Sequence, residues 1–438
     1  MDIDDEYVEG EEYLIMDESD IIKEIDTDEE ELEDADDEED ENEGSTLMMF
    51  IYNTFMAIYK TKRNKGKFVV TDFDDADEED EEEQEYEADD SVYAFTGHTG
   101  EVYTAICSLT DAKLVATGGG DNRGFIWKIG QGDSSLKLLE DHTDSVSSLA
   151  FSSDGQLLAS GSVDGHIRVW DTTSDSLKGK LEGPGGEIEW VRWHPRRHMV
   201  LAGAEYSAVL MWNVGIQEDM WRWFLLSGHG GSVTCGDFTP DGKFICTGSD
   251  DATLRIWDAE SGAECGRCIH AVRLSQADST TKGLNCLAIS LDSTRALTGS
   301  EDGSAHIVNI ITGKVVNSLS VHTQPILCAG FSASGSWAAT GGMDNKLIIW
   351  DLHTSSPRST CEHEAGVLCL LWLGKSSYVA TGCVDGKVRI WDSRSGECVR
   401  TFRGHTRAIQ SLSASSDGKH LVSASYDKTK TRFQYSRA

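Results

Sequence analysis

A serine, a histidine and an aspartate, the residue types of a hydrolytic triad, recur together along this chain. One copy consists of His142, Ser160 and Asp164, followed by Trp170. A histidine that takes the hydroxyl proton while an aspartate orients the ring would make the serine a nucleophile. The same set, with serine or threonine, returns in five copies at nearly the same spacing, whereas an enzyme needs only one. The recurrence therefore argues against catalysis and for a repeated structural unit.

Two other short motifs could carry chemistry. Cys265, Cys268 and His270 have the local spacing of a metal site, but a structural zinc site needs four ligands and the chain has no second pair. Residues 374–376 (Gly-Lys-Ser) resemble the end of a phosphate-binding loop, but Cys369 stands where that loop needs its first glycine. We predict a hairpin turn there. With no paired carboxylates, nucleophile elbow or cofactor fingerprint in the sequence, we expect no enzyme activity, no metal and no cofactor.

One marker residue per repeat shows which elements must position these side chains. The markers lie 41 to 51 residues apart and are Trp127, Trp170, Trp212, Trp257, Val308, Trp350, Trp391 and Phe433. Between markers, short β-prone runs alternate with turns, and in the second repeat the runs are 146–151, 157–160 and 167–170. This pattern indicates antiparallel four-stranded sheets, and such sheets stack radially. The sequence predicts an all-β fold with a single eight-bladed β-propeller.

The spacing, the Gly-His pairs and the Trp-Asp pairs resemble the WD-repeat family over residues 91–438. In that family a buried network joins the histidine, a serine or threonine, the turn aspartate and the tryptophan, and the resemblance implies the same role here. A buried aspartate needs donors, which the other side chains supply. The implied sets are His98, Thr117, Asp121, Trp127; His142, Ser160, Asp164, Trp170; His229, Thr247, Asp251, Trp257; His322, Thr340, Asp344, Trp350; and His363, Thr381, Asp385, Trp391.

Three repeats depart from this pattern. In the third, Pro184 replaces the histidine and Tyr206 the aspartate, while Val308 and Phe433 replace the tryptophan of the fifth and eighth. We expect these three blades to be held by packing more than by the network.

The composition changes at about residue 90. Residues 1–90 contain 39 of the 76 acidic and 6 of the 38 basic residues, with too little apolar surface to offset the entropy of ordering. We expect a disordered acidic tail, followed by a propeller of residues 91–438. The chain ends five residues after Phe433, so residues 91–96 should supply the outer strand of the last blade and close the ring.

Charge and cysteine usage limit the partners and the compartment. A net charge of −38 disfavours direct binding of nucleic acid or of an anionic membrane surface, and favours a basic protein segment as partner. The acidic start lacks the apolar core of a secretory signal, and the 11 cysteines lie mostly in strand-like runs. We expect a cytoplasmic monomer, with the nucleus and the cell cortex as alternative locations.

Residues 45–70 differ from the acidic sequence around them. They contain no acid, an apolar run at 47–59 and a basic cluster at 60–67. The apolar run is too short to span a membrane. Two interpretations remain: an interfacial helix with a basic flank, or a translated intron, since the residue types are those of AT-rich codons.

Three positions in each repeat of the WD-repeat family project onto the narrow top face of the ring. Of the 24 such positions here, six are acidic and none is Lys or Arg. The acids belong to blades one, three, four and five, and blades six to eight present mainly apolar residues. Such a face suits a segment that carries Lys or Arg beside apolar anchors. The partner-binding residues predicted in this way are Glu101, Tyr103, Glu187, Glu189, Glu205, Asp250, Glu301, Leu327, Met343 and Tyr426.

More specific motifs narrow the resemblance. Residues 189–196 (Glu-Trp-Val-Arg-Trp-His-Pro-Arg), 298–302 and 363–372 resemble a WD-repeat group with animal members linked to cell migration and angiogenesis. Its fungal members act as chaperones of a basic ribosomal protein of the large subunit. The resemblance implies a non-enzymatic scaffold that keeps such a client soluble during ribosome biogenesis. The alternative is a signalling scaffold at the cell cortex.

Overall fold

The computed structural model describes residues 89–131, 137–174, 176–183, 185–215, 221–259, 267–274, 282–427 and 430–434. The acidic tail and its segment 45–70 fall outside these ranges, apart from residues 89 and 90. Pro184 and Cys265 also lie outside the described residues.

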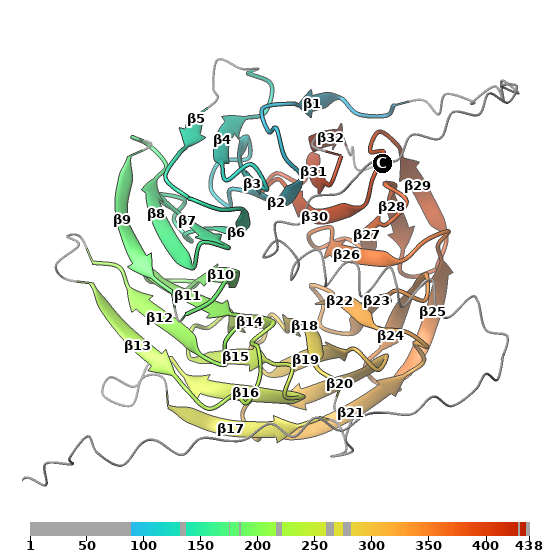
Figure 1. Ribbon diagram of the computed structural model, residues 1–438. Coiled ribbons are helices and arrows are strands. Elements are labelled where there is room, and N and C mark those ends of the chain that lie inside the picture. Colours follow the sequence, from blue (N-terminus) through green and yellow to red (C-terminus); the bar gives the residue numbers. More distant parts are fainter. Residues whose placement is uncertain are drawn as a thin grey trace, which may run out of the picture. The chain divides into compact units, whose positions relative to one another are not determined.

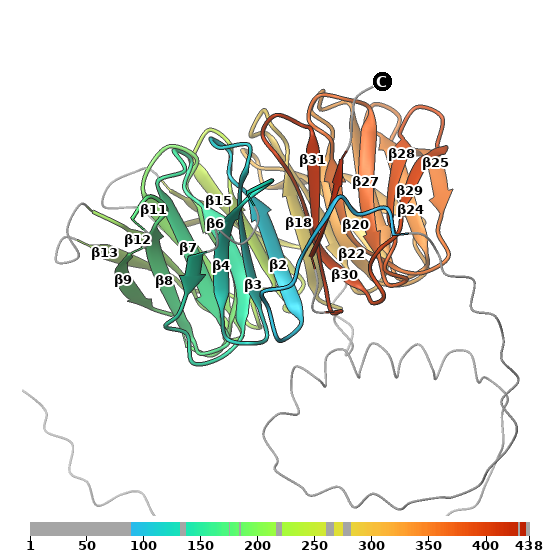
Figure 2. The same ribbon diagram turned by 90° about the horizontal axis from the view of Figure 1, so that it is seen from above.

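The described residues form 32 strands and no helix, arranged as eight four-stranded antiparallel sheets. Figure 1 shows these sheets standing around a common axis, as the blades of a propeller do, with one strand of each blade at the centre and one at the outside. Seen side-on in Figure 2, the strands run between the two faces of the ring. The predicted all-β propeller is confirmed.

The blades follow one another along the chain. Blade one contains β2 (Val102–Cys107), β3 (Leu114–Gly119), β4 (Gly124–Lys128) and β5 (Lys137–Leu139), and blade two β6 (Val146–Phe151), β7 (Leu157–Ser162), β8 (His166–Asp171) and β9 (Leu177–Glu182). Blade three contains β10 (Ile188–Trp193), β11 (Met199–Ala204), β12 (Val209–Asn213) and β13 (Arg222–Leu226), and blade four β14 (Cys235–Phe238), β15 (Phe244–Gly248), β16 (Thr253–Asp258) and β17 (Cys268–Arg273).

The second half of the ring repeats this order. Blade five contains β18 (Leu284–Ile289), β19 (Arg295–Ser300), β20 (Ser304–Asn309) and β21 (Lys314–Ser320), and blade six β22 (Ile326–Phe331), β23 (Trp337–Gly342), β24 (Lys346–Asp351) and β25 (Ser356–Glu362). Blade seven contains β26 (Val367–Trp372), β27 (Tyr378–Cys383), β28 (Val388–Asp392) and β29 (Cys398–Phe402). The last sheet contains β30 (Ile409–Ala414), β31 (His420–Ser425), β32 (Lys430–Gln434) and β1 (Tyr93–Phe95).

The last sheet combines the two ends of the described chain. Strand β1 pairs antiparallel with β32, with Tyr93 opposite Arg432 and Phe95 opposite Lys430. Phe95 is 3% exposed and its ring stacks on Trp127 of blade one at 5.5 Å. The residues expected to close the ring therefore form the outer strand of blade eight and also pack on blade one.

The apolar core lies between neighbouring blades. One cluster joins Val169 and Leu181 of blade two to Val200 and Trp212 of blade three, and similar clusters follow around the ring. The blades approach closely because glycine stands in their second strands. A Cβ at Gly341, for example, would lie 2.7 Å from Cγ1 of Val367 in the next blade, so a larger residue there would push the two sheets apart.

The innermost strand of seven blades contains a β-bulge near its start. The bulged residues are Tyr103, Ser147, Glu189, Asn285, Leu327, Leu368 and Gln410. A bulge bends the strand and redirects the extra side chain. These are the second of the three top-face positions predicted for each blade, so the bulge decides how that position is presented.

Candidate binding surface

The histidine network is complete in blade six. His322 Nδ1 lies 2.9 Å from Asp344 Oδ1, His322 Nε2 lies 2.8 Å from Thr340 Oγ1, and Trp350 Nε1 donates to the same hydroxyl at 2.8 Å. Every group is satisfied when a neutral histidine donates from Nδ1 to the carboxylate and accepts the threonine proton at Nε2. Equivalent chains run through His142 in blade two and His229 in blade four.

The aspartates of these chains are held in the ionised form. Burial raises the pKa of Asp164, but the hydrogen bonds from His142 and from the Thr143 backbone N–H outweigh burial and bring it below its ordinary range. Asp251 and Asp344 are shifted in the same direction for the same reasons. These carboxylates therefore join the histidine to the backbone of the turn, which is a structural role.

Blades one and seven contain only part of the expected network. In blade one His98 Nδ1 reaches Asp121 at 2.7 Å, but His98 Nε2 to Thr117 is 3.4 Å, and the buried indole N–H of Trp127 has no hydrogen-bond partner in the described structure. In blade seven His363 Nδ1 faces the carbonyl of Cys361 at 3.1 Å, and Asp385 accepts from Arg389 at 2.7 Å instead. The expectation of a His363–Asp385 contact was wrong, because an arginine takes the carboxylate.

Blade eight was expected to be held by packing more than by the network, but the structure gives it the histidine contacts. His405 Nδ1 lies 2.8 Å from Asp427 Oδ2, and His405 Nε2 lies 2.8 Å from Ser423 Oγ. The residue separations, 22 and 18, are those of the His142 set in blade two. The spacing was therefore a sufficient signal, which the replacement of the marker tryptophan by Phe433 obscured.

Two buried arginines belong to the network and were missed from the sequence. Arg168 is 4% exposed and donates to Asp164 at 2.9 Å and to Asp141 at 2.6 Å. Arg389 is 6% exposed and bridges Asp385 and Glu364. Both stand four residues after the turn aspartate and two before the tryptophan. Arg255 has the same spacing in blade four, where Asp251 pairs with His229 instead, so the spacing alone does not identify the contact.

Blade three is held by packing, as expected for a repeat without the histidine. Trp190 extends toward blade four, where its Nε1 donates to the Val233 carbonyl at 2.8 Å, and Trp193 extends back to the Ala150 carbonyl of blade two at 2.8 Å. Tyr206, at the place of the turn aspartate, is 60% exposed. Val308 of blade five is fully buried in a cluster with Ile256 and Leu284.

In three blades the second top-face position ties one blade to the next. Ser147 donates to the Ile188 carbonyl at 2.6 Å, Asn285 donates to the Ile326 carbonyl at 3.2 Å, and Thr234, at the same place in blade four, donates to the Leu284 carbonyl. Glu189 occupies this position in blade three. An ionised carboxylate has no proton to donate, so blade three places an acceptor where three other blades place a donor.

Three other predicted acids lie near Glu189. Burial, followed by the negative charges of Glu187, Asp250 and Glu205, raises the pKa of Glu189 to about 7. Glu205 and Asp250 are exposed and Glu187 is partly exposed. We call these four residues the acidic cluster. It lies where blades three and four meet, and its shared negative potential would attract a cationic group.

The other predicted top-face residues lie elsewhere on the ring. Tyr103 and Tyr426 make an edge-to-face contact at 5.8 Å across the junction of blades one and eight, and Glu101 lies near both hydroxyl groups. Met343 packs beside Gly366 where blades six and seven meet. Glu301 and Leu327 are partly exposed on blades five and six. The structure thus gathers four acids and separates Glu101 and Glu301 from them.

The cysteine–histidine motif and the Gly-Lys-Ser motif lie in a strand and a turn of the propeller. Cys268 and His270 both lie on β17, and no group of three or more His, Cys, Asp or Glu able to hold a metal occurs in the described residues. Residues 374–376 form the turn between β26 and β27. The described ranges also contain no helix long and apolar enough to cross a membrane.

Comparison with known proteins agrees with this architecture. The family model described as "WD domain, G-beta repeat" matches residues 89–128, 133–171, 223–258, 268–309, 313–351, 355–392 and 396–429. The chain belongs to the WD40 repeat family. The seven matches leave out 172–222, which contains most of blade three and lacks the histidine and the aspartate.

This WD40 chain is 32% identical to the human "Angio-associated migratory cell protein" over 354 residues, 77% of this chain and 79% of the relative. It is 29% identical to "Nuclear distribution protein nudF" of Aspergillus niger, over 68% of this chain and 60% of that protein.

Solved structures show the same fold. Chaetomium thermophilum Sqt1 bound to the N-terminus of ribosomal protein L10 matches with a TM-score of 0.71 and 23% identity, covering 80% of this chain and all of that one. Saccharomyces cerevisiae Sqt1 matches with a TM-score of 0.72 and 19% identity over the same share of each chain.

Proposed function

We propose that this WD40 propeller is a non-enzymatic cytoplasmic chaperone that binds a basic segment of a large-subunit ribosomal protein on its top face. The observation that carries the proposal is the acidic cluster. Glu187, Glu205 and Asp250 lie near the largely buried Glu189, and burial followed by their negative charges raises the pKa of Glu189 to about 7. A bound Lys or Arg would relieve this repulsion, so part of the binding free energy is already stored in the empty face.

The similarity to Sqt1 supports a ribosomal client. One of those structures contains the N-terminus of ribosomal protein L10, and we extend that class of client to this chain. The clustered acids would hold the cations of the segment, while Tyr103, Tyr426, Leu327 and Met343 would contact its apolar residues. Covering the segment would keep it from RNA and from aggregation until assembly.

The test is binding of a fluorescent peptide with the N-terminal sequence of the organism's own L10 protein. The variant replaces the three more accessible acids together, Glu187→Lys, Glu205→Lys and Asp250→Lys, and leaves the more buried Glu189 in place. We expect affinity to fall by at least about a hundredfold, because each of several close charge pairs turns from attractive to repulsive.

A matched control makes the same change of net charge outside the acidic cluster. Glu140, Glu362 and Glu397 are exposed, and their replacement by Lys should weaken binding only slightly and only at low salt. Equal losses in the two triple variants would show that net charge alone attracts the peptide, and the proposed site would be wrong.

A further inference from the structure

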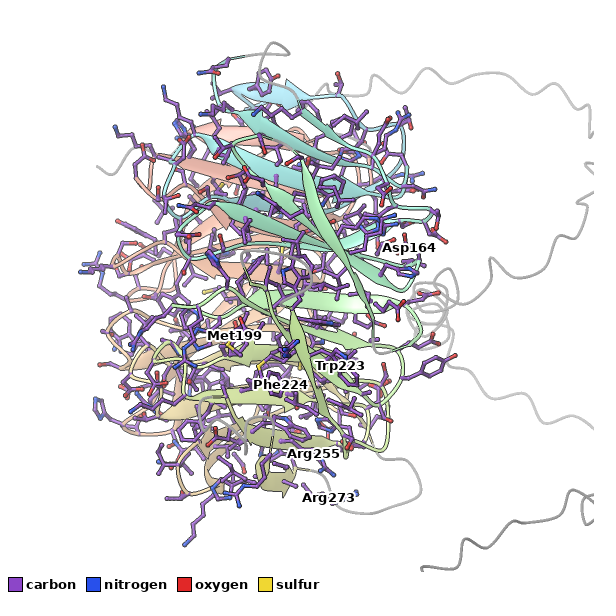
Figure 3. All side chains as sticks on the ribbon, turned by 90° about the vertical axis from the view of Figure 1, so that its left-hand side faces the viewer. Asp164, Met199, Trp223, Phe224, Arg255 and Arg273 are labelled. Atoms are coloured by element: carbon purple, nitrogen blue, oxygen red, sulfur yellow. The ribbon has the colours of Figure 1, made fainter. Side chains whose placement is uncertain are left out.

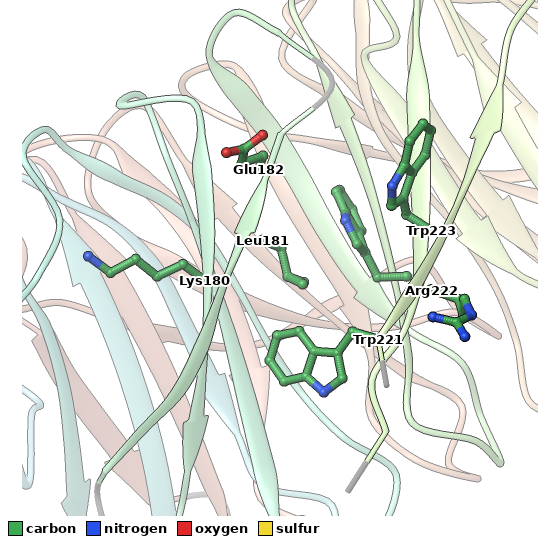
Figure 4. Close-up of a pocket in the computed structure, with 7 residues that line it drawn as sticks. Lys180, Leu181, Glu182, Trp221, Arg222 and Trp223 are labelled. Atoms are coloured by element: carbon green, nitrogen blue, oxygen red, sulfur yellow. The ribbon is translucent and has the colours of Figure 1, made fainter. Parts of the chain in front are cut away.

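A groove lined by tryptophan opens on the outside of the ring between blades two and three. Trp212, Trp221 and Trp223 line it together with Leu181, and its volume is about 300 Å³ (Figure 4). Trp212 is 4% exposed at the base, whereas Trp223 is 64% exposed. We call this feature the tryptophan groove. It lies on the outer side of the propeller, away from the acidic cluster.

The groove exists because blade three pairs its outer strands without a bulge. In blades two and four to seven the outer strand pair shifts register next to the repeat's marker residue. The marker then faces Leu177, Cys268, Val315, Pro357 or Cys398. In blade three the β12–β13 register is continuous, and Trp212 faces Trp223. A large aromatic side chain therefore stands exposed at a place where blades two and four to seven have a smaller residue.

The charge around the groove is opposite to that of the chain. The outer strands β5, β9, β13, β17, β21, β25 and β29 carry eight Lys or Arg and two Glu. Four of the cations and one Glu belong to β9, β13 and β17, on the side of the ring shown in Figure 3. This basic outer rim contrasts with a chain of net charge −38.

Cations also stand at the mouth of the groove. Lys180 and Arg222 line it, with Glu182 as the single acid. Lys180 pairs with Asp141 at 2.7 Å but its side chain is 51% exposed, and exposed pairs of this kind exchange partners at little cost. Arg222 is exposed and makes no ion pair with the described residues. A guanidinium can bind a carboxylate through two parallel hydrogen bonds, so Arg222 is a candidate contact for an acidic ligand.

We propose that the tryptophan groove binds an acidic segment of a partner protein, with an aromatic or leucine side chain packed against Trp221 and Trp223 and carboxylates on Arg222 and Lys180. Buried aromatic anchors supply most of the affinity of such contacts, and charge complementarity selects the partner. The outer rim and the top face would then bind partners of opposite charge at the same time.

The test uses the full chain and a short fluorescein-labelled peptide of glutamates with one Phe and one Leu, measured by fluorescence anisotropy. Trp223→Ala and Arg222→Glu should each weaken binding by at least about tenfold. Matched controls on blade five, Val316→Ala and Lys314→Glu, change a valine that is 54% exposed and an exposed lysine, both of β21. They should leave binding within about twofold. Because Trp223 is exposed, its variant should unfold at the wild-type temperature.

Three results would overturn the proposal. The first is equal binding of the peptide by wild type and Trp223→Ala. The second is equal binding of a peptide with lysine in place of glutamate. The third is a wild-type dimer in sedimentation that Trp223→Ala abolishes, which would assign the groove to a second copy of the chain. If Trp223→Ala still binds the basic L10 peptide, the top-face proposal stands even when the groove proposal fails.

Discussion

Replacing Glu189 by glutamine should stabilise the protein at alkaline pH and leave its stability unchanged in acid. The pKa of Glu189 is raised from 4.5 to about 7, chiefly by burial and then by three neighbouring acids. The folded protein therefore holds this proton more tightly than the unfolded chain does. Stability is unaffected below about pH 4.5, falls as pH rises through the window to about 7, and stays low above it.

The size of the effect follows from the shift. One pKa unit corresponds to about 1.4 kcal/mol, so a shift from 4.5 to about 7 destabilises the wild type by up to about 3 kcal/mol at pH 8. Glutamine cannot ionise and can donate a hydrogen bond from the position where Ser147 and Asn285 donate. The Glu189→Gln variant should gain up to that amount at pH 8 and almost nothing at pH 4.5.

Urea denaturation at the two pH values measures this difference directly. The control variant is Glu182→Gln on β9, whose side chain is exposed and which removes the same charge. A gain at pH 8 in Glu182→Gln as large as in Glu189→Gln would attribute the effect to net charge. Identical stability of Glu189→Gln and wild type at pH 8 would refute the reasoning that burial and the neighbouring acids disfavour ionised Glu189.

Two further predictions concern the ring itself. Thr340→Val removes the hydroxyl that His322 and Trp350 share at 2.8 Å and should lower the free energy of unfolding, measured with urea, by about 2–4 kcal/mol. Thr117→Val in blade one, where the histidine is 3.4 Å away, should lower it less. Equal losses in the two variants would contradict the stabilising role of the network. Deleting residues 91–97 removes β1 and should lower the melting temperature strongly, whereas deleting 1–88 should not, and equal melting of the two deletions would show that β1 does not close the ring.

The sequence predicted the parts of this structure that recur with the regular spacing of the repeats. Because His142, Ser160 and Asp164 keep a fixed spacing, the sheets and most of the network followed from residue order. His405 was within reach of the same reasoning. The Asp385–Arg389 contact was not, since two partners compete for one carboxylate and only the packed geometry decides between them.

The candidate surfaces were predicted less completely. The six top-face acids followed from family positions, but their separation into one cluster and two isolated residues depends on how blades three and four meet. The tryptophan groove depends on the absence of a bulge between β12 and β13. No residue type in those strands predicts a pairing without a bulge, so the exposure of Trp223 could not be predicted from the sequence.

The pairing of β1 with β32 also sets a time for folding in the cell. Phe95 meets Lys430, so the first strand leaves the ribosome long before its partner is made. At a synthesis rate of about 5–20 residues per second, the delay is on the order of tens of seconds. During that interval the unfinished ring has an open edge at blade one, where the buried Phe95 and Trp127 have no blade eight beside them. A protein proposed to shield another newly made chain therefore passes through a stage in which it needs shielding itself.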